Sequence, residues 1–70
     1  MITYNQNLII ELQKYVNEKD INILKDSGVP INNLEEKVPK EIIGELKKSG
    51  IITIVIGAYK FTTYAKKELL

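Results

Sequence analysis

The sequence predicts one small α+β domain in which helices precede a two-stranded β-hairpin and a short final helix. Apolar residues recur at helical spacing in the first half of the chain. Pro and Gly divide the middle of the chain into short helical segments. Residues 51–63 change to a pattern typical of a half-buried hairpin. A chain of 70 residues has room for one domain, residues 1–70, with a small core.

The first helix is predicted from an apolar stripe at i, i+4, i+7 and i+8, formed by Leu8, Leu12, Tyr15 and Val16. Its start has two candidate caps. One is Asn5 alone, and the other is Thr3 with Gln6 in a capping box. The polar residues 17–19 are expected to end this helix.

Three further helices are predicted between residues that interrupt helical hydrogen bonding. Asp20 can cap the second helix, and Gly28 can end it in a left-handed conformation. Pro30 begins the third helix. A sharp corner then leads into the fourth, which begins at Pro39 because proline has no amide hydrogen and suits a first turn. The fourth helix runs to about Ser49, and its apolar stripe comprises Ile42, Ile43 and Leu46.

The hairpin is predicted from two apolar runs separated by a glycine-containing turn. Gly57 as the first central residue favours a type II′ turn formed by Gly57 and Ala58. The register that follows pairs Ile56 with Tyr59, Ile54 with Phe61, and Ile52 with Thr63. One face of the hairpin is then apolar, with Phe61 in the core, and the other is mostly polar. A threonine after the hairpin is expected to cap a final helix over residues 64–70.

Composition excludes several classes of protein. The chain has no Cys and no His, so disulfides and the usual zinc sites are impossible. The usual general base and thiol nucleophile are missing as well. The adjacent Glu35 and Glu36 do not face each other on a helix. We therefore expect no enzymatic activity, no metal and no cofactor.

The chain is expected to lie in the cytoplasm. No apolar stretch approaches the roughly 18 residues of a membrane span. The first residues lack the basic and then apolar order of a signal peptide.

Charge is distributed unevenly along the chain, although the net charge is only +1. Residues 1–36 contain three Lys and six acidic residues, whereas residues 37–70 contain seven Lys and three acidic residues. This asymmetry fits either a basic face or ordinary solvated surfaces. All ten basic residues are Lys, which favours contact with phosphate over the bidentate base recognition typical of Arg.

The predicted order of elements resembles the winged helix-turn-helix family. Residues 43–52 read IGELKKSGII, which is similar to the end of a recognition helix that enters the first wing strand, with apolar residues four and seven positions before Gly50. Residues 59–70 read YKFTTYAKKELL, which resembles the second wing strand and the basic helix after it. The resemblance covers about residues 21–70. It implies a winged-helix fold and DNA binding through the fourth helix.

The candidate DNA contacts are Lys40, Lys47, Lys48, Lys60 and Asn33. The first three belong to the expected recognition helix, Lys60 belongs to the wing, and Asn33 lies early in the third helix. Each has a structural alternative. Lys47 and Lys48 also suit the negative end of the helix dipole, Asn33 suits a helix cap, and Lys60 suits a solvated sheet surface.

The leading expectation is binding of double-stranded DNA by a small transcription regulator or architectural protein. The alternative is a winged-helix adaptor or inhibitor that docks another protein, which Glu41 and Glu45 in the expected recognition helix favour. Lysines gathered on one face would favour DNA, and lysines interleaved with acidic residues would favour protein. The terminal segments are expected to close a homodimer interface, formed by Tyr4, Tyr64, Leu69 and Leu70.

Overall fold

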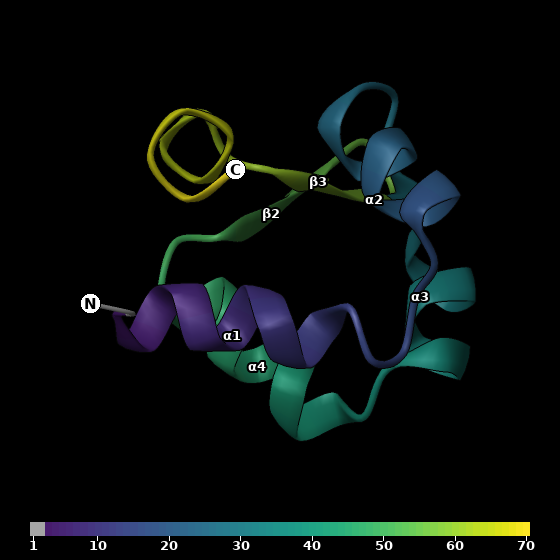
Figure 1. Ribbon diagram of the computed structural model, residues 1–70. Helices are drawn as coiled ribbons and strands as arrows, with labels where there is room; N and C mark the ends of the chain where they lie inside the picture. Colours follow the sequence, from purple (N-terminus) through teal and green to yellow (C-terminus); the bar gives the residue numbers. More distant parts are fainter. Residues whose placement is uncertain (1–2) are drawn as a thin grey trace.

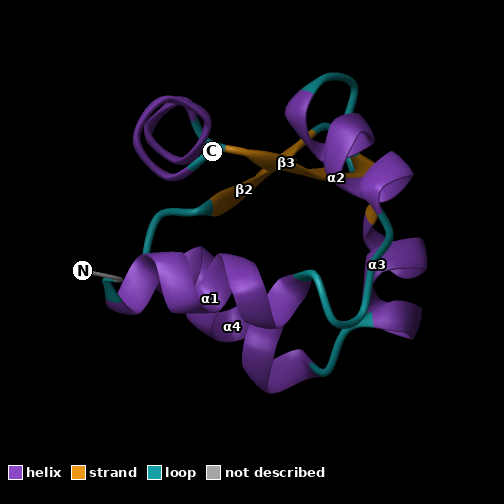
Figure 2. Ribbon diagram, in the orientation of Figure 1, coloured by secondary structure: helices purple, strands orange, loops and turns teal. Residues whose placement is uncertain are grey.

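A computed structural model describes residues 3–70 of the chain. The elements in chain order are α1 (Tyr4–Leu12), α2 (Glu18–Lys25), β1 (Val29–Pro30), α3 (Ile31–Lys37), α4 (Lys40–Lys48), β2 (Ile52–Val55), β3 (Ala58–Phe61) and the short π-helical segment η1 (Ala65–Leu69). The predicted α+β class is therefore confirmed. In Figure 1, α1 and α4 lie side by side below the hairpin of β2 and β3. Figure 2 shows helices above and below the strands of the hairpin.

The sheet has three antiparallel strands in the order β1-β3-β2, which corrects the predicted two-stranded hairpin. Val29 pairs with Tyr59, and Pro30 pairs with Ala58. Proline fits here because β1 lies at the edge of the sheet, where an amide hydrogen is not needed. A strand of two residues is too short to produce an alternating pattern. Sequence reasoning therefore recognises Pro30 only as the start of α3, which it also is.

The hairpin turn lies one residue earlier than predicted, so the predicted register is wrong by two. Ile52 pairs with Phe61, and Ile54 pairs with Tyr59. The central turn residues are Ile56 and Gly57, both with positive φ, as in a type I′ turn. A shift of two residues keeps every side chain on the same face, so the apolar pattern cannot distinguish the two registers. The observed register lets β1 pair with β3.

Ile56 is an unusual residue for this turn. Its φ is 47°, a left-handed conformation that is strained for a β-branched side chain, and its side chain is 99% exposed. We expect Ile56→Asn to raise the free energy of unfolding by about 1 kcal/mol, because Asn tolerates this conformation and no burial is lost.

Urea unfolding followed by circular dichroism measures this change. Val55→Asn is the matched control, because it makes the same kind of substitution at a neighbouring exposed strand position and should not stabilise the fold. A destabilised Ile56→Asn protein would contradict the turn geometry.

The starts of α1 and α2 decide between the candidate caps. Thr3 and Gln6 form the predicted capping box: the Gln6 amide donates to Thr3 Oγ1 at 3.1 Å, and the Thr3 amide donates to Gln6 Oε1 at 2.9 Å. Helix α1 ends at Leu12, earlier than expected. Asn17, and not Asp20, caps α2 by accepting from the Asp20 amide at 2.8 Å.

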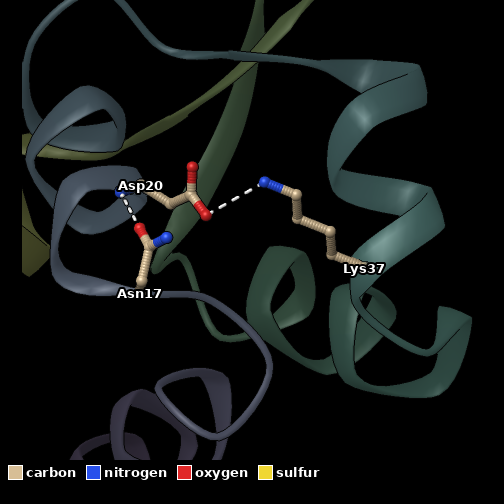
Figure 3. A network of polar contacts seen from close by, with 3 residues as sticks. All are labelled: Asn17, Asp20 and Lys37. Atoms are coloured by element: carbon tan, nitrogen blue, oxygen red, sulfur yellow. Dashed lines mark hydrogen bonds and ion pairs between the residues drawn. The ribbon is translucent and has the colours of Figure 1, made fainter.

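Asp20 has a different role, because its side chain connects two helices. Lys37 at the end of α3 donates from Nζ to Asp20 Oδ2 at 3.1 Å (Figure 3). The pair lies partly buried at the start of α2. The Lys37 ammonium group is therefore already paired with a carboxylate of the same chain.

The two ends of α4 follow the prediction. Val38 and Pro39 separate α3 from α4. At the other end, Gly50 has a φ of 74°, the Ile51 amide donates to the Leu46 carbonyl, and the Gly50 amide donates to the Lys47 carbonyl. These two bonds form a Schellman motif, which stops the helix and turns the chain into β2. Leu46 and Ile51 are both fully buried.

The core takes at least one buried side chain from each helix and strand. Those with no more than 2% exposure are Leu12, Leu24, Leu34, Val38, Leu46, Ile51, Ile52, Tyr59, Phe61 and Ala65. The predicted burial of Phe61 is confirmed. Thr62 stabilises the start of the last helix, because its Oγ1 accepts a hydrogen bond from the Ala65 amide at 3.1 Å. Helix α4 packs against this core along one side, through Ile43 and Leu46.

Candidate nucleic-acid interface

Three of the predicted DNA contacts lie together on α4. Ile43 and Leu46 face the core, and Lys40, Lys47 and Lys48 are exposed. Lys40 and Lys47 lie on the flank of α4 nearest α3 and β3, and Lys48 lies farther out toward solvent. Within residues 3–70, none of the three forms an ion pair with an acidic side chain. Their positive charges are therefore available to a ligand.

A shallow hollow of about 200 Å³ lies beside this flank of α4. It is lined by Glu35, Lys40, Ile43, Gly44, Lys47 and Tyr59. Its wall thus combines two lysines with one carboxylate. The hollow joins residues from the consecutive helices α3 and α4 to Tyr59 of β3, which is more distant in the sequence.

Tyr59 supports one of these lysines. Lys47 Nζ lies 5.9 Å from the centroid of the Tyr59 ring, within the range of a cation–π contact. The Tyr59 hydroxyl donates to Glu35 Oε2 at a long 3.4 Å. Burial of Tyr59 and the nearby negative charge of Glu35 raise the pKa of Tyr59 above 10.0. Tyr59 is buried, and its ring lies beside the Lys47 ammonium group.

Gly44 forms an open part of the hollow at the centre of α4. Glycine in a helix interior costs about 0.5–1 kcal/mol relative to alanine. Apart from its chain neighbours and the nearby backbone of α4, a Cβ at Gly44 would meet no atom of residues 3–70 within 4 Å, and its φ is not in the left-handed region. Packing within the described fold therefore does not explain this glycine. Sequence reasoning did not single out Gly44. A glycine at an exposed position inside a helical pattern is the signal that could have identified it.

The acidic residues of α4 lie on other parts of its surface. Glu45 lies toward α1, where its Oε2 accepts from the Tyr4 hydroxyl at 2.7 Å. This hydrogen bond raises the pKa of Tyr4. Glu41 is exposed near the side that carries Lys48. The flank with Lys40 and Lys47 is thus basic, and the flank toward α1 is acidic.

The other two predicted contacts do not join this cluster. Lys60 lies on β3 beside Tyr59, so its side chain points to the opposite face of the sheet. Its aliphatic part passes over Gly28, which leaves it half-buried. Asn33 is exposed in the first turn of α3 and is not part of the hollow. The structure therefore brings together only the lysines of α4.

The predicted dimer residues have contacts within the chain. Tyr4 is bonded to Glu45, and the Tyr64 hydroxyl accepts from Asn5 Nδ2 at 2.8 Å. These bonds connect α1 to α4 and to the end of the chain. Leu70 is exposed. Homodimerisation through these segments remains a prediction.

The β2–β3 hairpin exposes apolar residues that sequence reasoning did not identify. Ile54 and Val55 are 48% and 41% exposed, and Ile56 at the tip is exposed almost completely. The predicted pattern placed Ile54 on the buried face. Ile54 pairs with the buried Tyr59 of the central strand β3, but Ile54 itself lies on the edge strand β2 and stays half-exposed.

No helix formed by residues 3–70 has the length and apolar character needed to cross a bilayer. The same described residues contain no group of three or more His, Cys, Asp or Glu side chains placed to hold a metal ion. No protein-family model matches the sequence, and comparisons with curated proteins and with solved structures return no significant match.

Proposed function

We propose that the chain is a small winged-helix protein that binds double-stranded DNA. In this proposal α4 enters the major groove, and Lys40, Lys47 and Lys48 contact backbone phosphates. One observation carries the proposal: three lysines that are not in ion pairs within the described residues lie on the exposed surface of α4, away from the core. The order of α3, α4, β2 and β3, with a β1-β3-β2 sheet, supports the winged-helix arrangement.

Lysine makes this binding mainly electrostatic. A lysine ammonium group neutralises phosphate and releases counterions, but it does not read a base with the shaped donor pair of arginine. All ten basic residues of the chain are Lys, so no arginine is present to supply such base recognition. We therefore propose an architectural or regulatory role with weak base preference. The strength of binding should depend steeply on salt.

Titration of a fluorescent duplex, followed by anisotropy at about 50 and 200 mM salt, tests the proposal. The affinity of the natural sequence should fall tenfold or more across this range. Replacing Lys40, Lys47 and Lys48 together by Ala should weaken binding at low salt and lower the salt slope by about three, one for each phosphate contact.

The charge-matched control replaces Lys14, Lys19 and Lys25 by Ala. This variant loses the same charge from the first half of the chain and should bind nearly as well as the natural sequence. Equal weakening by both triple variants would mean that net charge alone, and not the surface of α4, drives binding. An absence of binding at about 50 mM salt would contradict the DNA proposal.

The exposed apolar residues of the hairpin favour a second candidate, a module that docks another protein. Ile54, Val55 and Ile56 are exposed apolar residues at the turn end of the hairpin, and such residues suit contact with a protein better than contact with phosphate. If duplex DNA does not bind, this candidate takes precedence. Ile54→Lys should then abolish binding of a purified partner while the helical circular dichroism signal is unchanged.

A further inference from the structure

The hollow beside α4 combines three features that point to a ligand. Gly44 lies at the centre of the helix, and no side chain or other element of residues 3–70, its chain neighbours aside, comes within 4 Å of the position that its Cβ would take. Lys40 and Lys47 stand four positions before and three positions after it, so all three residues share one side of the helix. Lys47 Nζ lies 5.9 Å from the centroid of the Tyr59 ring, and both residues line the hollow.

We infer that Gly44 is a point of close approach, where one backbone phosphate of the DNA duplex sits against α4 between Lys40 and Lys47. This inference rests on the proposed function. Two ammonium groups would neutralise the phosphate, and the missing side chain would let it come near the helix backbone. A methyl group at this position would occupy the space that the phosphate needs.

The charge around the hollow supports an anionic ligand. Its lining has two lysines and one carboxylate, and the Glu35 carboxylate accepts from the Tyr59 hydroxyl. Tyr59 therefore acts through its ring, which positions Lys47, and its hydroxyl proton is not offered to the phosphate. Ile43 closes the hollow on the side of the core.

Gly44→Ala tests the inference because its effects on stability and on binding have opposite directions. Alanine is the better helix former, and its Cβ meets no atom of the described fold, so the melting temperature should rise by about 2–8 °C. The affinity for duplex DNA at fixed low salt should nevertheless fall about tenfold or more, because a phosphate contact is lost. A purely structural role for Gly44 would not separate the two readouts in this way.

Asn22→Ala is the matched control. Asn22 is an exposed residue in the middle of α2, so alanine should stabilise that helix without affecting α4. Its affinity for DNA should equal that of the natural sequence. Inorganic phosphate, titrated at constant ionic strength and followed through the amide resonances of α4, tests whether a small phosphate ligand occupies the hollow instead.

The outcomes separate the two proposals. If the natural sequence binds DNA and Gly44→Ala binds as tightly or more tightly, the inference is wrong and the proposed function stands. If inorganic phosphate shifts the resonances around Gly44 but duplex DNA does not bind, the DNA source of the phosphate is overturned. Binding of neither ligand overturns both proposals.

Discussion

Replacing Leu46 by alanine is expected to lower the free energy of unfolding by about 3 kcal/mol. Leu46 is 0% exposed and belongs to the central core cluster. Its carbonyl oxygen also accepts from the Ile51 amide in the Schellman motif, and both side chains are buried where α4 turns into β2. Loss of the side chain leaves a cavity at the joint between the helix and the sheet.

This loss is large for a chain of this size. A 70-residue domain has a total stability of about 4–10 kcal/mol, so the variant keeps only part of it. Urea unfolding measured by circular dichroism gives the change. Lys48→Ala, in the same helix but exposed, is the control and should change stability by no more than about 0.5 kcal/mol. If Leu46→Ala cost under about 1 kcal/mol, α4 would not be packed as described.

Gly28→Ala is expected to destabilise the fold by about 3 kcal/mol, for a backbone reason and a steric reason. Gly28 has a φ of 93°, which side chains rarely adopt. A Cβ would lie 2.6 Å from Lys60 Cγ and 3.0 Å from the Tyr59 carbonyl oxygen. The lysine can move, but the carbonyl belongs to β3 and cannot move without disturbing the sheet.

Gly50→Ala separates the two reasons. Gly50 also has a positive φ, 74°, but a Cβ there would meet no atom of residues 3–70 within 4 Å. This variant should lose only the backbone contribution, about 1–2 kcal/mol. Thermal unfolding of both variants gives the comparison. Equal losses of stability in the two variants would show that the contact with β3 does not contribute to the effect at Gly28.

The local elements could be predicted because local physics decides them. Pro30 and Pro39 begin helices since neither can sit in a helix interior, and Gly50 ends α4 because glycine adopts positive φ at low cost. The apolar stripe of α4 identified Ile43 and Leu46 as its buried side. The exposed surface of α4, with its three lysines, followed from the same periodicity. DNA binding by this surface remains a proposal.

Only the tertiary structure decided how these elements meet. Two hairpin registers place the same side chains on each face, and pairing of β1 with β3 selects one. Capping by Asn17 instead of Asp20 frees the Asp20 carboxylate for Lys37, which is distant in the sequence. The hollow at Gly44 likewise joins three elements, and its lining depends on contacts between residues far apart in the chain. The amino-acid sequence by itself therefore determined the elements and their faces, because these depend on neighbouring residues. Register, the third strand and the candidate site depend on long-range packing, which no local pattern specifies.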